Sequence, residues 1–152
     1  MIKRIRPATP VVDTEKWRNL GENVEVELTS EDPESPVEGA LLAEESGGWR
    51  AGGPGRQTIC LMWPVPIAIN RIRLVFEEHA RARTQEFVLR ATTGDSQREI
   101  VRQQFTFSPP GTTVEREEYA TDLTGVSQLE LAIIPAIDGG HAVATLREWR
   151  IA

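Results

Sequence analysis

The sequence alternates apolar and polar residues over most of its length, and this period of two constrains the fold more than any other feature. Val24, Val26 and Leu28 alternate with Glu25 and Glu27, which is the pattern of a strand with one buried and one solvated face. Similar segments follow along the chain, at 59–63, 67–76, 87–91, 100–107, 114–119, 129–133 and 143–151. Turn signals separate them at the spacing of a sandwich, so the sequence predicts an all-β domain of about eight strands.

The alternation changes phase near Asn70. Ile67 and Ile69 occupy odd positions, whereas the next apolar run begins at Ile72 and continues at even positions. A slip of one residue would turn these side chains to the wrong face of the sheet. The pattern therefore predicts a β-bulge near Asn70.

Helical signals are few and short. The segment from Asp13 to Leu20 has capping residues and a stop at Gly21, and Pro36 to Glu45 offers one or two turns. The acidic stretch from Ser30 to Pro36 is typical of a surface loop. Because the sequence shows no linker and no repeat, it predicts one domain over residues 1–152, in which residues 1–20 form an N-terminal extension with a short helical turn.

Composition and charge narrow the expected partners. No stretch approaches the roughly 18 to 20 apolar residues that span a bilayer, so no membrane span is expected. A net charge of −6 argues against nucleic acid, because phosphate binding needs an electropositive surface. Met1 is not followed by the apolar run of a signal peptide, and Cys60 is the single cysteine. These features favour a cytoplasmic protein, or an extracellular one if a leader has been removed.

One ordered set of motifs runs from Val24 to the end of the chain. After a strand and a serine-containing loop come Pro36-Val37-Glu38-Gly39-Ala40-Leu41, Gly48-Trp49-Arg50, Gln57 to Trp63, Pro66 to Leu74 and finally Leu146 to Ile151. This order resembles the discoidin family, also called the coagulation-factor (F5/8) type C or galactose-binding-like family. The resemblance implies an eight-stranded antiparallel jelly roll whose loops at one end bind sugars, lipids or proteins. Glu38 and Thr58 depart from the family pattern, which has Asp and Trp there.

The resemblance also implies a possible structural calcium ion, which many sugar-binding members hold. By position, its ligands would come from the loop between Glu38 and Ser46 and from the carboxylate of Glu148. Calcium takes about six to eight oxygen ligands, of which these carboxylates supply only some. The alternative is that Glu148 pairs with an arginine or a backbone amide.

Candidate ligand-binding residues cluster in a basic segment and near one glycine pair. His79, Arg81 and Arg83 lie between two predicted strands, and galactose-binding members often use a His and an Arg from such loops. Imidazole and guanidinium groups donate hydrogen bonds to adjacent hydroxyls. The alternative is a solvated loop balanced by nearby glutamates. His141, after Asp138-Gly139-Gly140, is the other loop candidate or else a turn residue.

The four tryptophans divide into two groups. Trp49, Trp63 and Trp149 fall where the family builds its core, so we expect them to pack inside the sandwich. Trp17 lies before the first strong strand, where it either caps the core or lines a binding site.

Catalytic patterns are weak. The glycine-rich run Ala51 to Arg56 lacks the Gly-Lys-Ser/Thr of a phosphate loop and predicts an ordinary loop. Cys60 lies between apolar residues, as a buried thiol does. Adjacent glutamates such as Glu77 and Glu78 would point to different sides of a strand, and the two histidines form no metal motif. The sequence therefore predicts no enzyme.

The leading hypothesis is a carbohydrate-binding module whose site lies on the loops around Asp32–Ser35, His79–Arg83 and Asp138–His141. The alternative is an intracellular protein-interaction module of the same fold, which the missing leader favours. A third possibility is a domain appended to a larger glycoside-processing enzyme.

Overall fold

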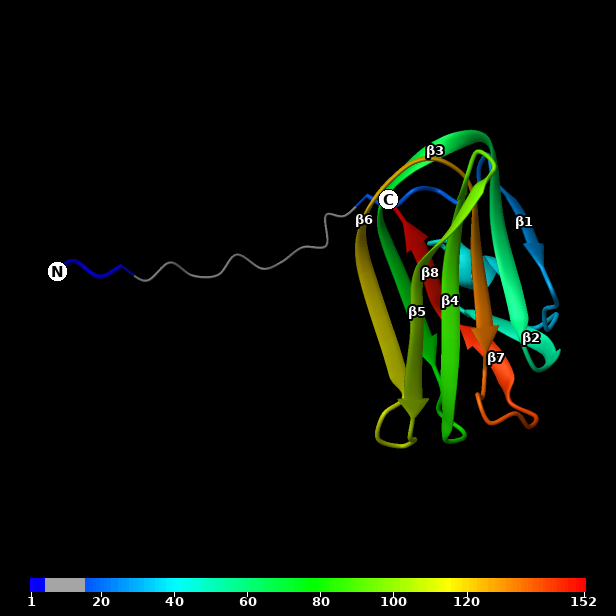
Figure 1. Ribbon diagram of the computed structural model, residues 1–152. Helices are drawn as coiled ribbons and strands as arrows, with labels where there is room; N and C mark the ends of the chain where they lie inside the picture. The colour runs from blue at the N-terminus through cyan, green and yellow to red at the C-terminus, as the bar shows by residue number, and fades with distance from the viewer. Residues whose placement is uncertain (5–15) are drawn as a thin grey trace.

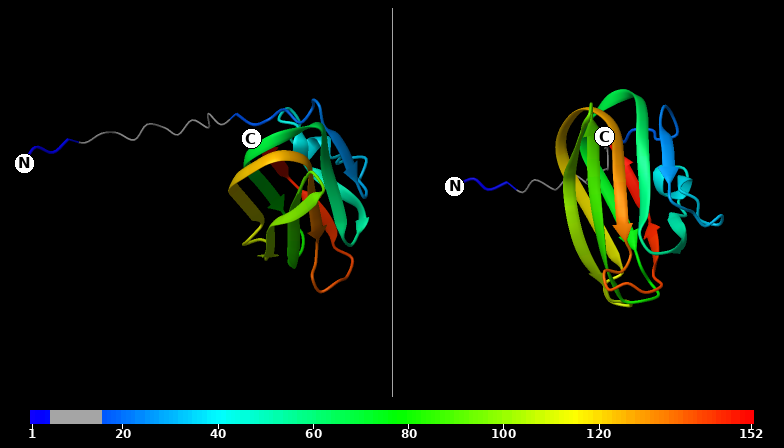
Figure 2. Two further views of the ribbon diagram at one scale, coloured as in Figure 1. Left: turned by 45° about the horizontal axis from the view of Figure 1, so that its top comes forward. Right: turned by 45° about the vertical axis from the view of Figure 1, so that its right-hand side comes forward.

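Two long strands, β3 (Gln57–Glu77) and β6 (Val114–Ile134), organise the structure, a computed structural model that describes residues 1–4 and 16–152. They pair antiparallel on both sides of an arch at one end of the molecule (Figure 1). Because both strands bend there, the first half of β3 and the second half of β6 lie in one layer. Their other halves lie in the facing layer (Figure 2).

The remaining strands extend these two layers. β1 (Glu25–Leu28) and β4 (Arg83–Thr93) flank the first layer, and β5 (Ser96–Phe107) pairs with β4 at its edge. β8 (Glu148–Ile151) extends the second layer, while β2 (Trp49–Pro54) and β7 (Val143–Leu146) form a separate two-stranded sheet. The helix α1 (Glu38–Leu41) precedes β2. With antiparallel pairing throughout, the predicted all-β sandwich is confirmed.

The predicted bulge lies in the arch of β3. The register between β3 and β6 shifts on both sides of Ile69, between Ile67 and Ile69 and between Ile69 and Arg71. The β3 residues with 0% exposure accordingly occupy odd positions up to Ile69 (Ile59, Leu61 and Ile69) and even positions from Ile72 onward (Ile72, Leu74 and Phe76). The shift keeps the apolar face of each half of the strand toward the core.

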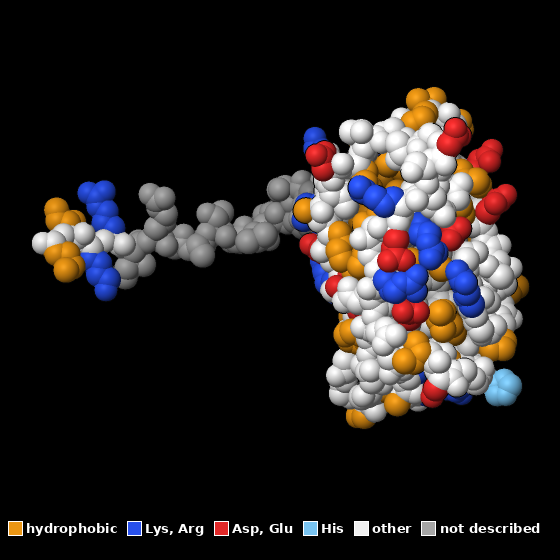
Figure 3. Space-filling model, in the orientation of Figure 1, with side chains coloured by type: hydrophobic (Ala, Val, Ile, Leu, Met, Phe, Trp, Pro, Cys, Tyr) orange, Lys and Arg blue, Asp and Glu red, His pale blue; other side chains and the backbone are white. Residues whose placement is uncertain are grey.

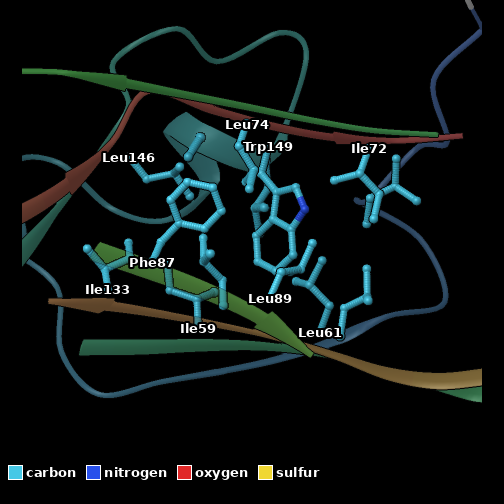
Figure 4. Packing of buried hydrophobic residues seen from close by; sticks show 14 of the residues in the cluster. Ile59, Leu61, Ile72, Leu74, Phe87, Leu89, Ile133, Leu146 and Trp149 are labelled. Atoms are coloured by element: carbon cyan, nitrogen blue, oxygen red, sulfur yellow. The ribbon is translucent and has the colours of Figure 1, made fainter. Parts of the chain in front are cut away.

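The core fills the space between the two layers. Figure 4 shows Ile59 and Leu61 of one layer facing Ile72 and Leu74 of the other, with Trp149 between them. Trp49, Trp63 and Trp149 are 2%, 5% and 0% exposed, so the prediction that these three tryptophans pack in the core is confirmed.

The local predictions at three segments compare with the structure as follows: one is partly outside the described residues, one was wrong and one was right. Lys16 to Asn19 are not helical, and Asp13 to Glu15 of the predicted helical turn lie outside the described residues. The Arg18 N–H instead donates to the carbonyl of Ile151, the last residue of β8, at 2.7 Å. The expected loop at Ala51 to Arg56 is largely strand, because Ala51 to Pro54 belong to β2. The short helix after Pro36 is present as α1.

A polar network lies between the layers, beside the β5 edge. Glu115 is 1% exposed, and its carboxylate accepts a hydrogen bond from Gln85 at 2.8 Å. Gln103 donates to Glu117 at 2.7 Å and accepts from the Tyr119 hydroxyl at 2.8 Å. Burial, with a further contribution from Glu117, raises the pKa of Glu115 to about 7.

Replacing Glu115 with Gln should stabilise the protein at pH 8 and leave its stability at pH 5 nearly unchanged. A carboxyl group with a raised native pKa contributes stability below its unfolded pKa and loses it as the pH rises through about 7. Gln stays neutral, so we expect a gain of about 1–3 kcal/mol at pH 8. Urea unfolding at both pH values measures the effect. The exposed Glu25→Gln variant is the control, and an equal gain for E115Q at pH 5 would contradict the account.

Candidate functional site

Several loops meet at the end of the sandwich opposite the arch. The connections over residues 78–82, 108–113 and 135–142 lie together there (Figure 1), close to the end of the β2–β7 pair. A hollow of about 250 Å³ opens between that pair and the start of the β3–β4 loop. We refer to it as the His79 hollow, and its lining consists of Ser35, Gly47, Gly48, Trp49, Arg50, Glu77, Glu78, His79, Thr145, Leu146 and Arg147.

One rim of the hollow is built by the loop before α1. The Asp32 N–H donates to the Arg50 carbonyl at 2.8 Å, and the Arg50 N–H donates to the Ser35 carbonyl at 3.1 Å. The buried Trp49 indole N–H donates to the Ser30 carbonyl at 3.1 Å. These bonds fasten the loop to β2 and hold Ser35 and Arg50 at the edge of the hollow.

A close glycine contact sets the position of α1 against the start of β2. The Gly48 N–H donates to the Gly39 carbonyl at 3.1 Å, and a Cβ at Gly39 would lie only 2.6 Å from the Gly48 carbonyl oxygen. Gly48 also has a φ of 72°, in the left-handed region that favours glycine. A side chain at Gly39 would push the helix away from the strand, and one at Gly48 would lie 3.1 Å from the Leu146 carbonyl oxygen.

Glu77 is the central polar group of the hollow. Its carboxylate lies 3.4 Å from the Nε2 atom of His79 and 3.9 Å from the Nε atom of Arg147. The Thr145 hydroxyl donates to the Glu77 carbonyl at 3.0 Å, which fixes the end of β3 against β7. The side chains of His79 and Arg147 are 65% and 43% exposed, so both can reach a ligand.

Arg83 was expected in the binding site, but its side chain lies inside the sandwich and is only 2% exposed. Its Nε atom donates to Glu78 at 2.8 Å, and its Nη1 atom donates to the Pro135 carbonyl at 2.9 Å and to Gln85 at 3.1 Å. The guanidinium also lies 4.9 Å from the centre of the Phe107 ring. Arg83 therefore joins the loops at this end of the fold and does not line the hollow.

Glu78 is held in its ionised form by these contacts. Burial by itself would raise the pKa of Glu78, but hydrogen bonds from Arg83 and from the Ala80 N–H outweigh it and lower the pKa. A carboxyl group with a lowered pKa is a poor proton donor. Glu115, whose pKa is raised, is buried between the layers.

The other predicted site residues lie apart from the hollow. Arg81 and His141 are exposed in their loops but do not line it. Trp17 lies against the second layer, where the guanidinium groups of Arg71 and Arg73 are 5.1 and 4.8 Å from its ring centre. Of the ligand-binding residues expected from the sequence, His79 is the one that the structure brings into this hollow.

The expected calcium ligands Glu38 and Glu148 are not part of a cluster of acidic side chains within the described residues. The described residues contain no group of three or more His, Cys, Asp or Glu side chains that could hold a metal ion. Glu148 pairs instead with the Nε atom of Arg150 at 3.1 Å, the arginine alternative considered above. The Nη1 atom of Arg150 donates to the Ala40 carbonyl at 2.9 Å. A guanidinium group therefore bridges α1 and β8, and Glu38 is exposed to solvent.

Sequence reasoning missed Arg50 and Arg147. Each directly follows a buried residue, Trp49 or Leu146, and these two buried residues are register partners in the β2–β7 pair. Side chains alternate across a strand, so Arg50 in β2 faces outward after the buried Trp49, while Arg147 lies in the bend just after β7. The positions of the two arginines next to buried residues are visible in the sequence. They point to a site only once β2 and β7 are known to pair, and the sequence predicts a loop for the glycine-rich part of β2.

Other features lie away from this hollow. A larger one, of about 520 Å³, lies beside the arch between Arg18–Asn23 and Trp63–Ile67, and its β3 wall includes Pro64 and Val65. Cys60 is buried, and burial together with Glu130 and Glu27 raises the pKa of its thiol to about 11, as befits an unreactive thiol. Over the described residues, no helix is long and apolar enough to cross a membrane.

Comparisons with known proteins support the fold. The sequence matches no family model and no curated protein. The structure resembles a family 32 carbohydrate-binding module (CBM32) from Clostridium perfringens in complex with GalNAc-β-1,3-galactose, with a TM-score of 0.64, 16% identity, and 90% of this chain and 99% of that chain covered. It also resembles the family 32 module of C. perfringens NanJ in complex with galactose, with a TM-score of 0.61, 10% identity and coverage of 85% and 93%.

A larger protein contains the same fold as one part. A GH29 fucosidase from Ruminococcus gnavus matches with a TM-score of 0.63 and 13% identity, over 88% of this chain and 26% of the fucosidase. The chain thus shares the β-sandwich fold of these CBM32 modules.

Replacing Arg83 with Met should destabilise the protein, whereas Arg81→Met should not. Loss of the guanidinium leaves Glu78 and the Pro135 carbonyl without their donor, and we expect a cost of about 2–4 kcal/mol. The exposed Arg81 has no comparable contacts, so its variant should stay within about 0.5 kcal/mol of the parent. Urea unfolding measures both, and equal effects would contradict a structural role for Arg83.

Replacing Arg150 with Met should destabilise the protein by about 1–3 kcal/mol, because the charge-assisted bond between β8 and α1 is lost. Urea unfolding of the variant and the parent measures the difference.

With the parent protein, EDTA or added calcium should leave the melting temperature unchanged, since a bound ion stabilises only the state that binds it. Thermal unfolding with EDTA and with calcium tests this. A calcium-dependent rise in the melting temperature would show that the ion binds after all.

Proposed function

We propose that this chain is a non-catalytic carbohydrate-binding module and that the His79 hollow is its sugar site. The observation that carries the proposal is the grouping of Glu77, His79 and Arg147 at the loop end of the sandwich, with exposed side chains that can donate and accept hydrogen bonds. Sugar hydroxyls both donate and accept, and adjacent hydroxyls match a guanidinium fork beside a carboxylate.

The size and lining of the hollow bear on how a sugar would bind. A volume of about 250 Å³ is below the roughly 300–1,000 Å³ of pockets for drug-sized ligands, so it suits one or two sugar rings. Trp49 lines the hollow but is 2% exposed, and its indole N–H is already bonded to Ser30. Without an open aromatic face, binding depends on hydrogen bonds, and we expect a Kd on the order of 1–10 mM for a monosaccharide.

The structural neighbours suggest which sugars to test first. The CBM32 modules described above were solved with GalNAc-β-1,3-galactose and with galactose. Sugars of the galactose type are therefore the first ligands to try on this chain.

Titration with galactose and with GalNAc-β-1,3-galactose should perturb the backbone NMR signals of Ser35, His79, Thr145 and Arg147. Replacing Arg147 with Met removes an exposed donor at the hollow and should weaken binding about tenfold. His141→Ala, on a loop outside the hollow, is the matched control and should bind like the parent. If the folded protein shows no change with any sugar at about 50 mM, well above the expected Kd, the proposed function is wrong.

A further inference from the structure

The charges in and behind the His79 hollow do not cancel. Glu78 is neutralised by the buried Arg83 at 2.8 Å. Glu77 is the carboxylate nearest to Arg147, at 3.9 Å. Arg50 also lines the hollow, but its side chain makes no hydrogen bond or ion pair within the described residues. Three arginines therefore face two glutamates, and one positive charge remains in a protein of net charge −6.

Arg50 lies where its guanidinium can contact a ligand in the hollow. It is exposed and is the register partner of Thr145, whose hydroxyl is bonded to the Glu77 carbonyl. Cross-strand partners have Cβ atoms roughly 5 Å apart, so the Arg50 side chain starts beside the Glu77 end of the hollow. Backbone bonds to Asp32 and Ser35 fix its position on β2.

The acidic residues of the neighbouring loop form no ion pair with Arg50 within the described residues. Glu31, Asp32 and Glu34 belong to the loop that carries Ser35, but none of them lines the hollow. The Glu31 carboxylate accepts the Val37 N–H at 3.1 Å, and the Asp32 carboxylate accepts the Glu34 N–H at 3.0 Å. Two of these three carboxylates thus serve backbone groups of their own loop.

Arginines on the outer face of the first layer contrast with Arg50. Acidic and basic side chains lie side by side over β4 and β5 (Figure 3). Arg90 lies 3.7 Å from Glu130, and Arg102 lies 2.9 Å from Glu99. Arg90 and Arg102 are thus paired with carboxylates, whereas Arg50 has no such partner within the described residues.

We propose that the sugar bound in the His79 hollow carries a carboxylate, as a uronic acid does, and that Arg50 binds this carboxylate. The inference rests on the proposed function and adds the chemical class of the ligand to it. The planar guanidinium group forms two parallel hydrogen bonds with a carboxylate, and such charge-assisted bonds are stronger than those to a hydroxyl. Arg147, Glu77 and His79 then bind the ring hydroxyls.

The test compares three sugars of the same ring configuration: galactose, galacturonic acid and the methyl ester of galacturonic acid. NMR titration at low salt should give about tenfold tighter binding of galacturonic acid than of galactose, with the uncharged ester close to galactose. Raising the salt concentration should reduce the preference, because the pair is exposed and screened. Arg50→Gln should abolish the preference, so that galacturonic acid and galactose bind this variant with similar affinity. Arg98→Gln, at an exposed position on β5, should keep the preference.

The other outcomes would contradict the acidic ligand class, the role of Arg50 or the proposed function itself. If galactose binds but galacturonic acid binds no tighter, the acidic ligand class is wrong and the proposed function stands. If the preference survives in the folded Arg50→Gln variant, Arg50 does not bind the carboxylate. If none of the three sugars binds to the folded parent, the proposed function and this inference both fail.

Discussion

The bend that carries β3 and β6 from one layer into the other is the constraint on which the rest of the structure depends. Both strands must keep an apolar face toward the core on each side of the arch, so the register has to shift within it. The shift around Ile69 does this in β3, and Gly125, with a φ of 65°, lies in the corresponding part of β6. Once the two strands are bent, β1, β4 and β8 have edges to pair with, and the ends of the long strands fix where the loops meet.

The candidate site follows from this arrangement through the β2–β7 pair. Trp49 and Leu146 are register partners that fill the core, and the pleat of β2 then turns Arg50 outward, while Arg147 lies in the bend just after β7. Thr145 ties β7 to the last residue of β3, Glu77, which lines the same hollow as the two arginines. The core therefore determines where the polar groups stand, and a change in the packing of Trp49 would move the hollow as well.

Much of the fold could be predicted from local pattern, but the site could not. The alternation and its phase change near Asn70 predicted strands and a bulge, because both depend only on which face a residue presents. Arg83 was misplaced because its burial comes from Pro135 and Phe107, which are distant in sequence. Trp17 was left open for the same reason, since the arginines that contact it lie on β3. His79 could be selected from its loop, whereas Arg50 needed the pairing of β2 with β7.

Three arginines show how one residue type serves structure or function according to its partners. Arg83 and Arg150 each bridge a carboxylate and a backbone carbonyl, with side chains 2% and 11% exposed, so removing either leaves buried groups unsatisfied. The Arg150 guanidinium joins α1 to β8, and its partner Glu148 is one of the residues that the resemblance implies as calcium ligands. Arg50 has neither kind of partner within the described residues and faces solvent at a hollow. An exposed guanidinium without such partners adds little to the stability of the fold, and its hydrogen-bond donors remain available to an anionic group of a ligand.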